Sequence, residues 1–196
     1  MKIICVDYNY CNNNYPNPII YLKPETVIIR NNQPFFYPDF SKEVYCQVAL
    51  VIKINKLGKN IKTKFAKTYY NEFGVSLNFI AKDVLANAIE EKLPWDLATS
   101  FDNSCVISDF IKFDEIDDIE NFSLKLFHNC NLDSNFFSSS FKLNIDEIIE
   151  EVSKYFLIKI GDFLFINTYQ KTLPIKIDDV IEIIGNDNKM VGVKVK

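Results

Sequence analysis

A strictly alternating segment, SKEVYCQVALVIKINK at residues 41–56, constrains the fold of this chain most. Its apolar residues are Val44, Cys46, Val48, Leu50, Ile52 and Ile54. A period of two places these side chains on one face of a β-strand that packs on a core. The other face is mixed, with Glu43, Tyr45, Gln47, Ala49, Val51 and Lys53. This mixed face is either an ordinary solvated surface or the lining of a site.

Further strands are expected along the chain, at residues 19–22, 27–29, 157–168 and 180–195, the last with a turn at 185–188. Helices are expected at about 64–72, ending at Gly74, and at about 81–92, where an apolar stripe includes Ala88 and Ile89. A third is expected at about 145–156, where Asn144 and Glu147 have capping-box spacing. Few strands alternate with helices. The predicted class is therefore α+β, with a largely antiparallel or mixed sheet in one domain over residues 1–196.

Composition argues against two classes of partner. The net charge is −4, and the lysines are interspersed with acids, which disfavours nucleic acid because phosphate backbones require clustered basic residues. No apolar segment approaches the ~20 residues of a membrane span, and the start MKIICVDYNY is too short for a signal peptide. The five cysteines are scattered without CxxC spacing, which favours reduced thiols. We therefore expect a cytoplasmic protein.

The residues alone give little chemistry. The chain has no glycine-rich phosphate loop, no GxSxG and no HExxH, and its only histidine, His128, is expected to be a hydrogen-bonded structural residue. An acidic segment at 114–120 is expected to be an exposed loop. These patterns indicate no more than an α+β domain without transmembrane segments.

The order of several segments resembles the fumarylacetoacetate hydrolase family, in its small one-domain acylpyruvate-hydrolase branch. The matching segments are MKIICV at 1–6, PIIYLKPETV at 18–27, PDFSKEV at 38–44, KLPWDLATSFDNSCVIS at 92–108, IIEEVSKYFLIKIGDFLF at 148–165 and PIKIDDVIE at 174–182. The resemblance implies a mixed, rolled β-sheet core with a few flanking helices. It also implies a divalent-cation-dependent hydrolysis, decarboxylation or isomerisation of acylpyruvates and related β-dicarbonyl acids.

The resemblance also places the family's functional positions on this chain. Two glutamates of one strand and an aspartate, which hold magnesium or manganese in the family, fall on Gln47, Ala49 and Asn78. The family's catalytic lysine falls on Thr99, and its N-terminal lid on a shortened segment at about 8–17 that has neither histidine nor glutamate. Since all three carboxylates are replaced, no metal cofactor is expected.

Three interpretations follow. The first is a non-catalytic family member without catalytic residues, acting as a binding, regulatory or partner subunit, in a homodimer or in a heterodimer with an active paralogue. The alternative is an active hydrolase or isomerase whose site is relocated or independent of metal, with Asp39, Glu43, Asp83 and Asp102 as carboxylates near the old ligand positions. The third is a pocket for a neutral small molecule, in which the ligand-binding residues are Tyr45, Gln47, Asn78, Thr99 and Thr168.

Overall fold

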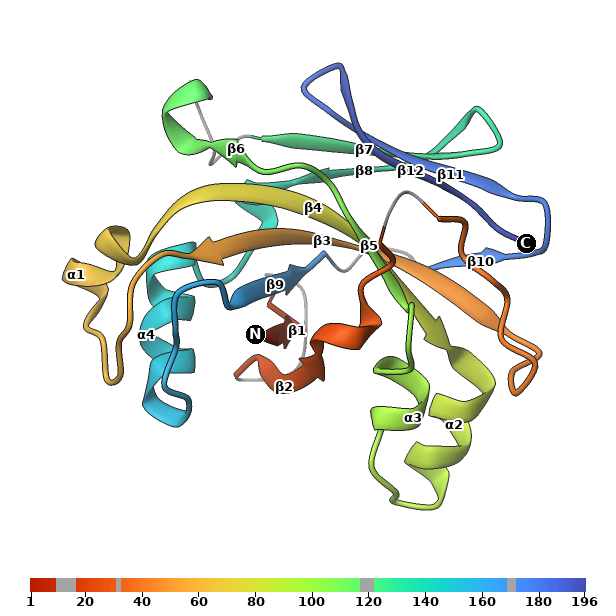
Figure 1. Cartoon of the computed structure of the whole chain (residues 1–196), viewed down its shortest axis with the longest axis horizontal. Helices are drawn as coiled ribbons and strands as arrows, with labels where there is room; N and C mark the ends of the chain where they lie inside the picture. The colour runs from red at the N-terminus through yellow and green to blue at the C-terminus, as the bar shows by residue number, and fades with distance from the viewer. Residues whose placement is uncertain (10–16, 31–32, 117–121, 169–171) are drawn as a thin grey trace.

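The structure, a computed structural model, describes residues 1–9, 17–30, 33–116, 122–168 and 172–196 (Figure 1). The elements in chain order are β1 (Lys2–Asp7), β2 (Ile19–Pro24), η1 (Glu25–Val27), β3 (Val44–Ile54), α1 (Thr63–Ala66), η2 (Lys67–Tyr69), β4 (Tyr70–Ala81), α2 (Lys82–Glu90), α3 (Asp96–Thr99), β5 (Cys105–Ile107), β6 (Ile111–Lys112), η3 (Phe113–Glu115), β7 (Ser123–His128), β8 (Asn131–Phe137), η4 (Ser138–Ser140), α4 (Ile145–Tyr155), β9 (Phe163–Asn167), β10 (Leu173–Ile175), β11 (Val180–Gly185) and β12 (Asn188–Lys194). The lid segment expected at about 8–17 lies largely outside the described residues.

Two β-sheets organise the chain. The larger has eight strands in the order β2-β1-β9-β3-β4-β5, with β10 beside β3 and β6 beside β4. Strands β1 and β9 are parallel, and the other pairs of this sheet are antiparallel. The second sheet, β12-β11-β7-β8, is antiparallel and lies above the long strands β3 and β4 in Figure 1. The predicted α+β class with a mixed sheet is confirmed.

The larger sheet curls until its two ends meet. Ile28, which follows β2 and η1, pairs with Cys105 of β5, and Ile29 donates a backbone hydrogen bond of 2.8 Å to the Cys105 carbonyl. One face of the sheet therefore encloses an interior, which we call the barrel interior. Its apolar residues are Ile3, Cys5, Val27, Ala49, Val51, Cys105 and Phe165. The opposite face packs against the second sheet and α4 in the main core.

The alternating strand at 44–54 is confirmed with the expected bounds, and both of its faces are buried. Leu50 and Ile52 lie in the main core with Leu77 and Phe79 of β4, whereas Ala49 and Val51 lie in the barrel interior. Because the strand separates two packed spaces, its mixed face is not a solvated surface. It lines the inside of the curled sheet.

Two strand predictions were wrong: one segment forms no strand, and the other forms a shorter one. Residues 27–29 form no strand, because Glu25–Val27 is a 3-10 turn and Ile28 makes only an isolated bridge. The strand predicted at 157–168 is confined to β9, since the chain first makes a turn at Gly161, whose φ of 83° is in the left-handed region. The predicted hairpin at the C-terminal end is confirmed as β11 and β12.

The first predicted helix was also wrong in extent. It covers only Thr63–Ala66 and a 3-10 turn, and β4 begins at Tyr70. Gly74, expected to end the helix, lies inside β4, where an added Cβ would meet the Ser108 hydroxyl oxygen at 2.9 Å. The sheet therefore needs a glycine there for close approach of the segment after β5.

The other two helices differ in how well the predicted faces are buried. In α2 only Ala88 of the predicted stripe is buried, and Ile89 is 54% exposed. In α4 the capping box is confirmed: Asn144 accepts from the Glu147 amide at 3.0 Å, and Glu147 accepts from the Asn144 amide at 2.9 Å. Within the described ranges, no helix has the length and hydropathy needed to cross a bilayer.

Several local expectations can be checked directly. The Nε2 atom of His128 lies 2.9 Å from the Asp179 carboxylate, in agreement with a structural role. Four of the cysteines, Cys5, Cys46, Cys105 and Cys130, are free thiols, and Cys130 is exposed; Cys11 lies outside the described residues. In the acidic segment, Asp114 and Glu115 are exposed, and residues 117–120 are outside the described part.

Candidate functional site

Strand register brings polar side chains from four inward faces to one level of the barrel interior. Gln47 of β3 lies directly opposite Asn78 of β4, and Ala49 lies opposite both Ser76 of β4 and Asn167 of β9. Asp7 ends β1 directly after Val6, which pairs with the residue before Asn167. Residues far apart in the sequence therefore converge where β1, β3, β4 and β9 run side by side.

These side chains form a connected hydrogen-bond network, which we call the Asp7 cluster. Gln47 Nε2 donates to Asp7 Oδ1 and Tyr21 Oη donates to Asp7 Oδ2, each at 3.3 Å. Asn167 Nδ2 donates to Tyr21 Oη at 3.3 Å, and Asn78 Nδ2 donates to Asn167 Oδ1 at 3.2 Å. The members of the cluster are Asp7, Tyr21, Gln47, Ser76, Asn78 and Asn167.

The environment of Asp7 raises the pKa of its carboxyl group above the ordinary value. Burial is the largest cause, and hydrogen bonds from Asn167 and Gln47, with the charge of Lys23, offset part of the rise. Burial likewise raises the pKa of Tyr21 well above its ordinary value, so this phenol stays protonated. Asp7 keeps part of its surface accessible to solvent. The cluster thus combines one titratable carboxyl group with a neutral hydroxyl donor.

Among the described residues, the barrel interior next to the cluster contains one lysine and two thiols. Lys23 is 2% exposed, and it shares the inward face of β2 with Tyr21, which pairs with Cys5. Burial raises the pKa of Cys5 and of Cys105 to about 12, and the nearby Lys23 charge lowers each pKa in part. Both thiols are therefore neutral near pH 7, and they offer no negative charge to the lysine.

The structure brings together two of the five residues predicted to bind a ligand. Gln47 and Asn78 belong to the Asp7 cluster, and Tyr45 lies on the same strand face as Gln47 but pairs with Ile80. Thr99 Oγ1 donates to the Trp95 carbonyl at 3.1 Å, within its own helical turn.

Thr168 lies apart from the other four predicted residues. Its hydroxyl donates to the Val48 carbonyl at 2.8 Å, and the side chain lies beside Leu50 and Phe136 in a small cavity on the main-core side. Ligand binding at all five positions remains a prediction.

Sequence reasoning missed four members of the site and its cation: Asp7, Tyr21, Ser76, Asn167 and Lys23. One signal was available in IIYLKP, where a lysine interrupts a strand that is otherwise apolar or aromatic. A charged residue at an inward position of such a strand indicates a buried charge, which is rare unless it is paired or functional. The strand pairings that assemble the other residues are not visible in local sequence.

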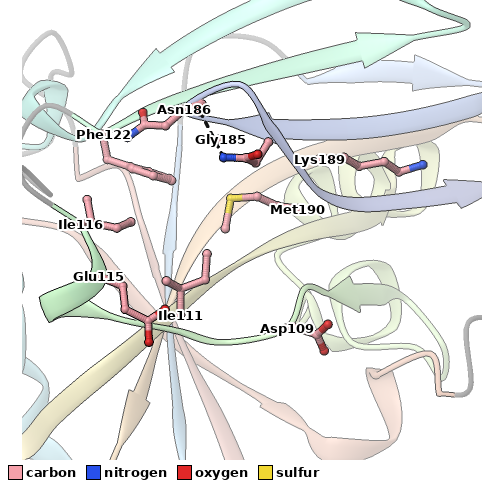
Figure 2. Close-up of a pocket in the computed structure, with 10 residues that line it drawn as sticks. Asp109, Ile111, Glu115, Ile116, Phe122, Gly185, Asn186, Lys189 and Met190 are labelled. Atoms are coloured by element: carbon pink, nitrogen blue, oxygen red, sulfur yellow. Dashed lines mark hydrogen bonds between the residues drawn. The ribbon is translucent and has the colours of Figure 1, made fainter.

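A larger cavity of about 540 Å³ lies elsewhere, between β6 with η3 and the β11–β12 hairpin (Figure 2). Ile111, Ile116 and Met190 line its apolar part. Lys189 extends away from that part in Figure 2 and is ion-paired with Glu182. Since no acid and base converge on this cavity among its lining residues, the Asp7 cluster is the better candidate for catalysis.

Comparison with known proteins identifies the family. The family model described as fumarylacetoacetate (FAA) hydrolase C-terminal matches residues 2–187. The chain belongs to the fumarylacetoacetate hydrolase family. It is 30% identical over 188 residues to the protein named oxaloacetate tautomerase FAHD1, mitochondrial, from Mus musculus, covering 92% of this chain and 85% of that protein.

Two solved structures of the family share the fold. A fumarylacetoacetate hydrolase family protein from Yersinia pestis superimposes with a TM-score of 0.91 and 26% identity, covering 100% of this chain and 92% of that one. Fumarylpyruvate hydrolase from Pseudomonas aeruginosa, solved in complex with Mn²⁺ and pyruvate, gives a TM-score of 0.91 at 18% identity, covering 100% of this chain and 89% of that one. The resemblance stated from the sequence is confirmed.

The expectation of a non-catalytic protein, a pseudoenzyme, was wrong. The curated mouse relative is an oxaloacetate tautomerase, which points to an enzyme. The expectation was drawn from three replaced carboxylates, and it overlooked that the same space holds Asp7, whose carboxyl group has a raised pKa. Losing metal-ligand positions does not remove acid–base groups from the site.

The residues present do not fit the family's divalent cation. The cluster offers one carboxylate, Asp7, and three amides, and the amide nitrogens of Gln47 and Asn78 donate to oxygen atoms within the cluster. Mg²⁺ is instead held by carboxylate and water oxygens in octahedral geometry. Within the described part of the chain, no three Asp, Glu, His or Cys residues are placed to hold a metal ion.

The carboxylates considered for a relocated metal site do not replace the lost ligands. Asp83 accepts from the Ser41 hydroxyl at 2.6 Å and from the Lys42 amide at 2.8 Å, which fixes it at the start of α2. Burial is the largest single influence and raises the pKa of Asp83, but the hydrogen bonds from Ser41 and from the backbone amides of Lys42 and Val84 together lower the pKa below its ordinary value. Asp39, Glu43 and Asp102 are exposed. The relocation interpretation therefore gains no support from these four residues.

Proposed function

We propose that the chain is an enzyme that catalyses proton transfer beside the carbonyl of a small keto acid, the keto–enol tautomerisation of an oxaloacetate-like substrate, at the Asp7 cluster. The single observation that carries this proposal is a partly buried carboxyl group with a raised pKa, held by neutral donors that include Gln47, one of the positions that the resemblance assigns to the family's metal ligands. The likeness to an oxaloacetate tautomerase supports the choice of substrate class.

Each group in the cluster has a role that its chemistry supports. The Asp7 carboxylate removes the proton from the carbon next to the carbonyl, and returns it to the carbonyl oxygen, so the reaction is balanced without a redox partner. A raised pKa lies closer to neutral pH, and general acid–base catalysis is most effective when the pKa of the catalytic group is near the working pH. The amide nitrogens of Gln47 and Asn78 each carry a second hydrogen besides the one used within the cluster, and these can donate to the enolate oxygen as charge develops.

The test follows the loss of oxaloacetate enol by ultraviolet absorbance, comparing wild type with Asp7→Asn. The variant keeps the shape of the side chain, replaces one acceptor oxygen by an N–H donor and removes the base, so we expect kcat/KM to fall roughly 10²- to 10⁴-fold. Asp39→Asn is the matched control, because it removes an exposed carboxylate near β3. Equal activity of wild type and Asp7→Asn, or no acceleration by the wild type, would refute the proposal.

Two further expectations belong to this proposal. A homodimer is supported by exposed apolar side chains on the protruding α2–α3 region, where Ile89, Leu93 and Leu97 are 54%, 53% and 77% exposed (Figure 1). Sedimentation of wild type against Leu97→Asp tests it, and a dimer that the variant weakens is the expected result. A cytoplasmic location remains a prediction, supported by the free thiols among the described cysteines.

A further inference from the structure

Lys23 is an unusual residue for its position. It is 2% exposed, it lies opposite Ile3 in the β1–β2 pair, and it is among the largest fully buried side chains. Across the described residues, no acceptor forms a hydrogen bond or an ion pair with its ammonium group. A lysine buried in this way is normally paired, because moving an isolated ammonium ion out of water is costly.

No anionic group among the described residues forms an ion pair with Lys23. The thiols of Cys5 and Cys105 lie close enough for the Lys23 charge to lower their pKa, but burial keeps them neutral. The Lys23 charge also lowers the pKa of Asp7 in part, but the Asp7 oxygens accept hydrogen bonds from Gln47 and Tyr21 and none from Lys23. The interior therefore has a positive charge and lacks a fixed anion bonded to it.

The neutral residues at the family's metal positions explain why the charge is available. Gln47 is 4%, Ala49 0% and Asn78 1% exposed, so carboxylates there would add buried negative charge to the interior that holds Lys23. In the family, carboxylates at these positions hold a divalent cation. In this chain the carboxylates are replaced by neutral side chains, and the ammonium group of Lys23 is present nearby in the interior. A small anion entering this space would meet one positive charge and several N–H donors.

We infer that Lys23 is the anion-binding group of this site, and that it makes binding of a small dicarboxylate or keto-acid anion independent of a divalent cation. The inference rests on the proposed function for the site and adds the charge class of the ligand and the group that holds it. It also favours an anion over the neutral ligand considered from the sequence. Charge-assisted hydrogen bonds from lysine to carboxylate are stronger than neutral ones.

The test is calorimetric titration of oxalate into protein freed of metal by a chelator, and again with Mn²⁺. Oxalate is the probe because it resembles the enolate of a keto acid. We expect stoichiometric binding without metal and no change in affinity with Mn²⁺. For Lys23→Met we expect binding at least about tenfold weaker, since a hydrogen bond to a charged group contributes about 1.5 to 3 kcal/mol. Lys112→Met, which removes an exposed lysine of β6, is the control and should bind as wild type.

Thermal unfolding separates a binding role from a structural one. Without oxalate, Lys23→Met should unfold at a higher Tm than wild type, because an unpaired buried charge has been replaced by an apolar side chain of similar length. Oxalate should raise the Tm of wild type and not that of the variant. A variant that is less stable or does not fold would show that the ammonium is paired within the fold, and would overturn the inference.

The remaining outcomes distinguish this inference from the proposed function. Oxalate binding that needs Mn²⁺, or equal binding by Lys23→Met, overturns the inference even if the protein turns over oxaloacetate. Metal-free oxalate binding without turnover of oxaloacetate supports the inference and removes the proposed function alone.

Discussion

Restoring the family's three carboxylates provides the sharpest test of how the site is built. The variant combines Gln47→Glu, Ala49→Glu and Asn78→Asp. Positions 47 and 78 are directly opposite in the β3–β4 pair, and position 49 faces Asn167 and Ser76 in the same enclosed space. The new carboxylates would therefore join Asp7 in one small volume.

The magnitude follows from these pairings. Side chains directly opposite in a sheet have Cβ atoms about 4.5 to 5.5 Å apart, and two charges at ~5 Å repel by ~3 kcal/mol at an effective dielectric constant of 20. Partial protonation relieves some of this repulsion, so we expect a net loss of a few kcal/mol without metal. For a chain of this length, each kcal/mol lowers Tm by about 2–4 °C. The loss should be larger at pH 8 than at pH 5, because the carboxylates are ionised at the higher pH.

Metal should reverse the effect. Mn²⁺ at about 100 times its Kd would stabilise the variant by ~2.7 kcal/mol, and the wild type should show no such shift. The assay is thermal unfolding with and without Mn²⁺, together with calorimetric titration of the metal. The single variant Ala49→Gln is the control for packing, because Ala49 is fully buried and any larger side chain adds strain without charge. An unchanged Tm and no heat on adding Mn²⁺ would refute the convergence of these three positions.

Three further predictions concern stability. Asp7→Asn should remove the part of the stability loss at rising pH that Asp7 causes. The folded pKa of Asp7 lies above its ordinary value of 3.8, so the stability that the protonated Asp7 contributes is present below pH 3.8 and is lost as the pH rises through the folded pKa. Tm of this variant should therefore exceed that of wild type at pH 8 and approach it near pH 3 to 4; a constant difference across pH would contradict this. Asn144→Ala removes the cap of α4 and should cost about 1 kcal/mol, or ~2–4 °C in Tm, and no change would show that the cap is replaced by water. Phe79→Ala removes a ring stacked on Phe35 with centroids 3.8 Å apart and should cost roughly 3–5 kcal/mol, measured as a lower urea midpoint at constant m-value; a loss below about 1 kcal/mol would contradict the packing.

Elements with a strong local pattern could be predicted from the sequence. The strand at 44–54 is specified by six apolar residues at alternate positions, and the start of α4 by the paired Asn144 and Glu147 side chains. The helix at 64–72 failed because β4 begins at Tyr70 and continues an alternating row through Phe73 and Val75 that lies in the main core. Sheet pairing overrode the local helical preference of the preceding residues.

The site was predicted only where one strand pair defines it. Gln47 and Asn78 lie opposite each other in β3 and β4, which are close in the sequence, and both are among the residues predicted from the sequence to bind a ligand. Asp7 and Asn167 meet only because β1 pairs in parallel with β9, a contact that no local pattern encodes. The expectation of a non-catalytic protein was drawn from three residue positions alone, and the likeness to an oxaloacetate tautomerase overturns it.

The parallel pairing of β1 with β9 also has a consequence for synthesis on the ribosome. The register joins Ile3 to Phe163 and Val6 to Ile166, so the first strand emerges long before its partner exists. At about 5–20 residues per second, roughly 10 to 30 s separate the two events. During this interval the apolar segment IICV of β1 has only β2, its antiparallel partner, to protect it from pairing with other chains. The Asp7 cluster should therefore assemble only after translation has passed β9, which supplies Asn167.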